Sequence, residues 1–129
     1  MKEYLYKGLL VLAATMAPIK PLLLACGALI VADMVTGMMA ARKRQEPINS
    51  ADMRRSLSKM VVYQVAIISA FVLETYMLEG LLPVTKVVGG VIGMVEFKSI
   101  LENVSTIAGQ DIVKMVLDKL GSKNAKGLK

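Results

Sequence analysis

A single carboxylate, Asp33, lies in the middle of an apolar run that covers residues 22–41 and ends at Arg42, Lys43 and Arg44. A helix of about 20 residues, rising about 1.5 Å per residue, spans the roughly 30 Å hydrocarbon core of a bilayer. A carboxylate inside that core costs about 2.5–3.5 kcal/mol on insertion scales, so it is usually reserved for a polar pathway or a helix–helix contact. The basic residues that follow are typical of the cytoplasmic end of a membrane helix. The run therefore predicts an integral membrane protein.

The composition supports this class and excludes several functions. The chain has 129 residues, of which 55% are hydrophobic, and this leaves little sequence for a soluble domain. It has no histidine and one cysteine, Cys26, so histidine-dependent catalysis and a disulfide within the chain are excluded. We expect no catalytic, cofactor-binding or metal site and no enzyme activity. The net charge of +6 is grouped beside the apolar segments, which favours contact with anionic lipid over nucleic acid.

A shorter apolar segment, residues 4–19, precedes the run that contains Asp33. Pro18 and Pro21 are predicted to end it, because proline cannot donate the helical hydrogen bond from its own nitrogen. The segment is short for a helix that spans a bilayer. It either crosses the membrane or lies in the interface, and the first interpretation is slightly favoured.

Two further apolar segments, residues 60–82 and 84–101, are separated by Gly80 and Pro83. A connection of only a few residues favours an antiparallel hairpin. The sequence therefore predicts an all-α membrane protein with three or four transmembrane helices and a single structural unit. Residues 21–103 form its membrane core, and residues 1–20 form an N-terminal apolar helix.

Basic residues predict the orientation of the chain in the membrane. The loop 42–59 contains six of them: Arg42, Lys43, Arg44, Arg54, Arg55 and Lys59. The turn between the last two apolar segments contains only Lys86. The positive-inside rule therefore places the loop 42–59 and the C-terminus in the cytoplasm, where the basic side chains also contact lipid phosphates. The N-terminus is inside if residues 4–19 cross the membrane, and outside if they do not.

The tail, residues 104–129, is predicted to be cytoplasmic, amphipathic and basic. Residues 111–120 form its helix, which places four apolar residues on one face: Ile112, Met115, Val116 and Leu120. Gly121 is expected to stop this helix. Residues 122–129 are expected to be disordered.

Asp33, Thr36 and Gly37 share one face of their helix, because they are three and four residues apart. One interpretation, which we favour, is a polar stripe that meets a partner helix or lines an aqueous lumen. The other is a structural hydrogen bond within the monomer. Gly37 favours the first interpretation, since small residues let helix backbones approach closely in a membrane.

A second group of candidate residues lies on segment 84–101 and just beyond it. Gly89 and Gly93 form a G-x-x-x-G pattern, which permits close helix packing. Polar residues follow on one helix face: Glu96, Ser99 and Asn103. Lys98 and Glu102 are spaced to form an i,i+4 pair. The favoured interpretation is a polar face that assembles subunits and lines an opening; the alternative is a charged turn at the level of the lipid headgroups.

The order of these motifs resembles the phage lysis and toxin-secretion holin family. Residues 32–37, Ala-Asp-Met-Val-Thr-Gly, precede a basic loop that leads to Arg54, Arg55 and Lys59, and this is similar to the family's Asp-x-x-Ser/Thr-Gly helix and the loop after it. Residues 96–103 are similar to the family's Glu-x-x-Ser-Ile-x-Glu-Asn stretch. The resemblance covers approximately residues 20–110.

The resemblance implies a pore-forming holin, which oligomerises in the bacterial inner membrane and opens lesions that release a cell-wall hydrolase or a toxin. Membrane lipids and further copies of the chain would be its partners. Asp33, Thr36 and Glu96 would then pair between subunits before opening and face water afterwards. The rival interpretation is a membrane scaffold without conductance: an antiholin, or an anchor for a phage or envelope protein.

Overall fold

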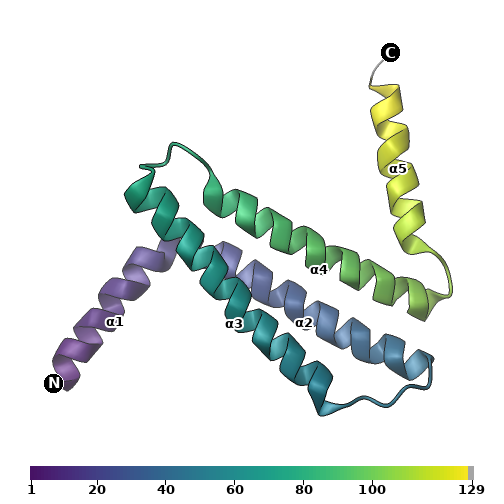
Figure 1. The fold of residues 1–129 in the computed structure, drawn as a ribbon, viewed down its shortest axis with the longest axis horizontal. Helices are drawn as coiled ribbons and strands as arrows, with labels where there is room; N and C mark the ends of the chain where they lie inside the picture. The colour runs from purple at the N-terminus through teal and green to yellow at the C-terminus, as the bar shows by residue number, and fades with distance from the viewer. Residues whose placement is uncertain (128–129) are drawn as a thin grey trace.

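The computed structural model describes residues 1–127, which form helices joined by short turns. Within these residues there is no strand, so the predicted all-α class is confirmed. A 3-10 turn, Ala17–Ile19, joins the first two helices, and a π turn, Leu73–Met77, extends the third. Five α-helices follow one another along the chain: α1 (Lys2–Met16), α2 (Lys20–Lys43), α3 (Ser50–Val72), α4 (Val84–Ala108) and α5 (Ile112–Lys126) (Figure 1).

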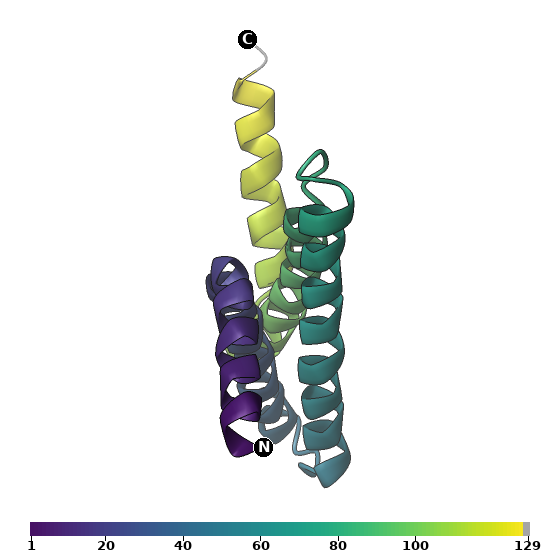
Figure 2. The same ribbon diagram turned by 90° about the vertical axis from the view of Figure 1, so that its left-hand side faces the viewer.

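Helices α2, α3 and α4 pack against one another and form a three-helix bundle. Figure 1 shows these three helices side by side, with α1 and α5 projecting from the bundle at opposite ends. In the view of Figure 2, α5 again extends beyond the bundle. The core contains Ile19, Cys26, Ile30, Ile67 and Ile92, whereas no residue of α1 is buried. The bundle is therefore the part of the molecule that can hold a site.

The two prolines near the N-terminus produce a bend with no intervening loop. Helix α1 ends at Met16, as Pro18 predicts, but the 3-10 turn and α2 follow directly, and Lys2–Lys43 is almost continuously helical. Pro21 lies in the first turn of α2, where the backbone nitrogen has no helical acceptor to lose. Figure 1 shows α1 turned across the direction of the bundle helices.

Helix α3 begins at Ser50, so the predicted loop 42–59 is wrong in its second half. The side chain of Asn49 caps the helix by accepting hydrogen bonds from the backbone N–H groups of Ala51 (3.0 Å) and Asp52 (3.2 Å). An asparagine cap with an aspartate in the first turn satisfies the free N–H groups and the helix dipole. The connection between α2 and α3 is therefore only residues 44–49.

Helix α5 extends through Gly121 to Lys126, so the expected stop at Gly121 is wrong. An isolated glycine costs about 1 kcal/mol inside a helix, which does not suffice to end this one. The expected disorder at residues 122–129 is likewise wrong for the part that lies in the helix, and residues 128–129 lie outside the described residues. Gly109, with φ of +66°, ends α4 in the left-handed conformation and turns the chain into α5.

Two helical stretches, Lys2–Lys43 and Ser50–Met77, are long and apolar enough to cross a membrane. An 18-residue segment of each has a mean hydropathy of 2.0 and 1.7, respectively. The distribution of side chains agrees with a membrane protein. Large apolar residues such as Leu24, Val61 and Val91 are exposed, whereas the carboxylate of Glu96 is fully buried. A folded chain in water would normally place these two kinds of residue the other way round.

Candidate functional site

Lys59 of α3 joins a carboxylate of α2 to a carboxylate of α4. Its Nζ lies 2.8 Å from Oδ2 of Asp33, and 3.0 and 2.9 Å from the two oxygens of Glu96. The side chain of Glu96 is fully buried, and those of Asp33 and Lys59 are 12% and 24% exposed. Three helices that share no sequence neighbours are thus connected by one ammonium group.

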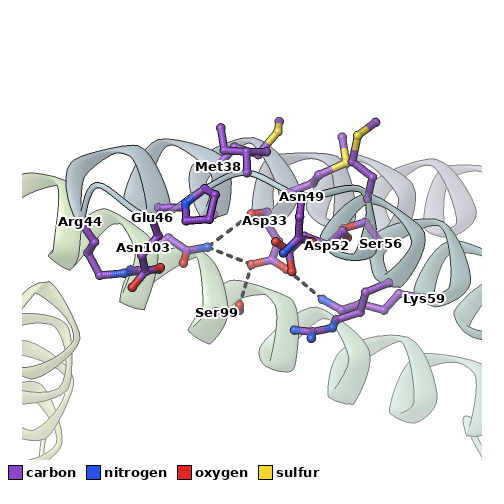
Figure 3. Close-up of a pocket in the computed structure, with 17 residues that line it drawn as sticks. Asp33, Met38, Arg44, Glu46, Asn49, Asp52, Ser56, Lys59, Ser99 and Asn103 are labelled. Atoms are coloured by element: carbon purple, nitrogen blue, oxygen red, sulfur yellow. Dashed lines mark hydrogen bonds and ion pairs between the residues drawn. The ribbon is translucent and has the colours of Figure 1, made fainter.

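Neutral side chains of α4 complete the shell around Asp33. Ser99 Oγ donates to Oδ1 of Asp33 at 2.6 Å, and Asn103 Nδ2 donates to the same oxygen at 3.1 Å (Figure 3). Asn103 also lies 3.2 Å from Oγ1 of Thr36, whose hydroxyl donates to the backbone carbonyl of Ala32. We call Asp33, Thr36, Lys59, Glu96, Ser99 and Asn103 the polar cluster.

The polar cluster has two carboxylates and one ammonium group, so its formal charge is −1 when all three groups are ionised. Buried charges lose their hydration, and this loss is recovered only if each charge is paired and hydrogen-bonded. Within the described residues, Lys59 is the basic side chain that forms an ion pair with either Asp33 or Glu96. The arrangement therefore depends on Lys59 more than on either carboxylate.

Along the bundle, the polar cluster lies at the level where α3 and α4 change from charged to apolar residues. Lys59 follows the charged first turns of α3, which contain Asp52, Arg54 and Arg55. On α4, the exposed ion pair between Lys98 and Glu102 (3.2 Å) lies just beyond Glu96 along the helix. From α2 alone the position of Asp33 suggests the middle of the bilayer, whereas α3 and α4 place the polar cluster nearer to the end that carries residues 44–49.

An open pocket of about 550 Å³ connects this end of the bundle to the polar cluster (Figure 3). The connection 44–49 and the first turns of α3 form one side, and Asp33, Lys59, Ser99 and Asn103 form the other. Arg44 and Glu46 pair at 2.9 Å at its edge. The hydrogen bond from the Arg44 guanidinium lowers the pKa of the Glu46 carboxyl below its usual value.

Because the pocket is open and Asp33 lines it, water that enters the pocket can reach Asp33 from the end that carries residues 44–49.

Three of the predicted glycines lie where α4 approaches α2. A Cβ at Gly89 would lie 2.8 Å from Cδ1 of Leu22, which is too close for an undisturbed contact. A Cβ at Gly37 would lie 3.6 Å from Nδ2 of Asn103, and one at Gly93 would lie 3.8 Å from Leu29. Gly89 is thus the glycine that this packing most requires, and all three contacts are made within one chain.

The remaining predicted residues lie apart from the polar cluster. Glu102 is exposed and pairs with Lys98 at the spacing predicted from the sequence. The basic residues Arg42, Lys43, Arg44, Arg54 and Arg55 are exposed at the end of the bundle that carries residues 44–49. Lys59 differs from them, because its ammonium group points into the bundle instead of toward lipid phosphates, and this corrects its predicted place in a loop.

Asp33 and Glu96 find their partners within one chain. Every partner of Asp33 and Glu96 described above belongs to the same chain. The alternative of a structural hydrogen bond within the monomer therefore describes the single chain, and no second subunit is needed to satisfy these groups.

Two polar contacts on the apolar segments were not singled out in the sequence. Gln64 Nε2 donates to the backbone carbonyl of Leu23 at 3.0 Å and ties α3 to α2. Glu74 Oε2 accepts from the backbone N–H of Thr85 at 2.7 Å and so caps the start of α4 from the π turn. In the sequence, the only indication of either contact is a polar residue within an apolar segment.

In the described residues no group of three or more His, Cys, Asp or Glu could hold a metal ion.

Comparison with known proteins gives one match. The sequence model of the bacteriophage holin family matches residues 10–122, a range that includes the bundle, the polar cluster and most of α5. Neither the curated proteins nor the solved structures contain a significant match.

Proposed function

Because this chain belongs to the bacteriophage holin family, we propose that it oligomerises in the cytoplasmic membrane of a bacterium and opens lesions there. The lesions would let a cell-wall hydrolase or a toxin leave the cytoplasm. The observation that most supports a membrane opening is the polar cluster, which places polar groups from three helices inside an apolar exterior. These groups supply a surface that can line water once the helices separate.

In this proposal α2, α3 and α4 cross the bilayer. Helices of 23 to 25 residues are about 35–38 Å long, which exceeds the roughly 30 Å hydrocarbon core. Each of the three helices contains four charged residues. On α4, Glu96 is paired with Lys59 and fully buried, so its carboxylate does not face lipid. Helix α1, which contains no buried residue and is largely apolar after Lys7, is embedded in lipid next to the bundle.

The closed state, in our proposal, is the bundle with the polar cluster intact. Exposing a charged side chain to the hydrocarbon core costs about 2.5–3.5 kcal/mol, so the polar cluster keeps its helices together while lipid surrounds them. When many copies gather, the polar faces of α2 and α4 can turn toward a shared aqueous space without meeting lipid. Hydration then replaces the pairing with Lys59, and the balance between the two states sets when the membrane opens.

The test uses bacterial cells that express this chain together with a muralytic enzyme that lacks an export signal. We expect culture turbidity to fall after a delay, because the enzyme reaches the cell wall only through a lesion. Asp33→Asn, which removes a charge but keeps the size, should accumulate to the same membrane level and change the delay. Asp33→Leu, which cannot hydrogen-bond, should change it further.

Two outcomes would contradict the proposal. If turbidity stays constant although the protein accumulates in the membrane, the chain is a scaffold, an anchor or an antiholin. Co-expression with an active holin then identifies an antiholin by a longer delay. If both Asp33 variants lyse on the wild-type schedule, lesions form without any contribution from the buried charge.

A further inference from the structure

Helix α5 has a surface that neither the bundle nor the polar cluster uses. Ile112, Val113 and Val116 are partly buried near the turn that follows α4, whereas Leu117 and Leu120 are 61% and 59% exposed. These apolar residues lie on one side of the helix, by its period of 3.6 residues. The opposite side contains Asp118 and Ser122, which line a shallow depression together with Lys119 and the exposed Met115.

The charge of α5 is strongly unbalanced. Its fifteen residues contain four lysines and one aspartate, which gives a formal charge of +3. A helix with an apolar side and an excess of lysine is typical of helices that lie in the headgroup region of an anionic bilayer. Each lysine near such a surface strengthens binding by about fivefold.

The turn between α4 and α5 is well defined and sets the direction of α5. Gly109 is left-handed, Ser105 Oγ accepts from the backbone N–H of Ile112 at 3.0 Å, and Asp111 caps α5 by accepting from the N–H of Lys114 at 2.9 Å. Figure 1 shows α5 projecting from the end of α4 instead of continuing the direction of that helix. The turn therefore directs α5 away from the axis of α4 at the end of the bundle that carries residues 44–49.

We propose that α5 is an interfacial helix that binds anionic phospholipid headgroups at the end of the bundle that carries residues 44–49. Leu117 and Leu120 insert below the headgroups, and the lysines contact lipid phosphates. This fixes the depth of the C-terminal end of α4 and of the Lys98–Glu102 pair. The proposal depends on the membrane location of the bundle but not on lesion formation, so it can fail or succeed independently of the proposed function.

The chain contains no tryptophan, so a single introduced tryptophan reports on one position. Full-length Leu120→Trp is reconstituted in vesicles of phosphatidylcholine, with or without phosphatidylglycerol. In anionic vesicles we expect blue-shifted emission that brominated lipid quenches, and a shift back toward the emission of water-exposed tryptophan at high ionic strength. Ser122→Trp, on the polar side and with unchanged charge, is the matched control and should resemble water-exposed tryptophan throughout.

The full-length Leu120→Trp protein is also used to test whether binding to anionic lipid depends on the lysines of α5. Replacing Lys114, Lys119 and Lys123 by glutamine should abolish the difference between anionic and neutral vesicles, since three lysines at about fivefold each amount to about a hundredfold in binding. Water-like emission of Leu120→Trp in anionic vesicles would overturn the proposal. Blue-shifted emission that brominated lipid does not quench would also overturn it, because a second copy or another protein would then cover this side.

Discussion

At the scale of single residues, Lys59 determines whether the polar cluster can stay buried. It neutralises one of two carboxylates and hydrogen-bonds to both, whereas the neutral donors Ser99 and Asn103 contact Asp33 but not Glu96. Removing one partner of a buried ion pair usually destabilises a protein by about 3–5 kcal/mol, because the other charge is left unpaired. Removing Lys59 leaves two such charges.

We therefore expect Lys59→Met to lower the unfolding free energy by about 3 kcal/mol or more. Glu96→Gln should cost less, because it leaves a neutral pair between Lys59 and Asp33. The measurement is unfolding of the protein in detergent micelles, followed by circular dichroism. Lys98→Met is the matched control: its exposed pair with Glu102 should contribute less than about 1 kcal/mol. Equal stability of Lys59→Met and Lys98→Met would contradict this account of the polar cluster.

Much of the polar cluster could be predicted from the residue spacing within single helices. The ion pairs of Lys59 with Asp33 and Glu96 could not. The spacing of Asp33 with Thr36, and of Glu96 with Ser99 and Asn103, predicts two polar faces, and the structure places them against each other. Lys59 was assigned to a basic loop, because a lysine next to two arginines and before an apolar segment is typical of a topology signal. Only the register of α3 against α2 and α4 shows that its ammonium group points inward.

At the scale of helices, the packing of α4 on α2 depends on the absence of one side chain. A Cβ at Gly89 would lie 2.8 Å from Cδ1 and 3.3 Å from Cγ of Leu22, so Leu22 would have to move. Gly90, the next residue, has nothing within 4 Å of the corresponding position. The G-x-x-x-G pattern predicted close packing here, but sequence alone did not rank Gly89 above Gly93.

Gly89→Ala should destabilise the bundle by about 1–3 kcal/mol, since overpacking a close helix contact forces the neighbouring side chain out of its position. Gly90→Ala should be neutral or slightly stabilising, because alanine favours the helix and meets nothing there. Unfolding in detergent distinguishes the two variants. Leu22→Ala in the Gly89→Ala background should recover part of the loss, and a failure to do so would refute the contact as its cause.

Helix boundaries show why element lengths were harder to predict than element types. The apolar segment 60–82 predicted the membrane part of α3, but the helix begins at Ser50, where Asn49 caps a polar stretch. Hydropathy reports where a helix would meet lipid, whereas capping decides where the backbone becomes helical. The same distinction explains why α5 passes Gly121, a residue that is tolerated within a helix as well as at its end.

At the scale of the whole molecule, five exposed basic residues gather at the end of the bundle where α2 ends and α3 begins: Arg42, Lys43, Arg44, Arg54 and Arg55. By the positive-inside rule this end faces the cytoplasm. Ser50 is exposed there and can carry a label without disturbing the polar cluster. In a background that lacks Cys26, Ser50→Cys should react with a membrane-impermeant maleimide only after the cells are permeabilised. Labelling in intact cells would reverse the orientation.

The central claim is that α2 and α4 are held together by the polar cluster in the closed state and must separate for the membrane to open. A cross-link between the two helices, placed one helical turn from Asp33 and Glu96, tests this directly. The side chain of Leu29 ends 3.8 Å from where a Cβ at position 93 would lie, so the two positions face each other across α2 and α4. Leu29→Cys and Gly93→Cys are introduced into a protein that lacks Cys26, and mass spectrometry of the oxidised protein establishes that the disulfide has formed.

The measurement is the release of a fluorescent dextran from lipid vesicles that contain this double-cysteine protein, before and after reduction. The account predicts no release while the disulfide is present and release after dithiothreitol is added, whereas oxidised Gly93→Cys alone should release dextran in both conditions. Equal release from the oxidised and the reduced double-cysteine protein would contradict the account, because lesions would then form without separation of α2 and α4.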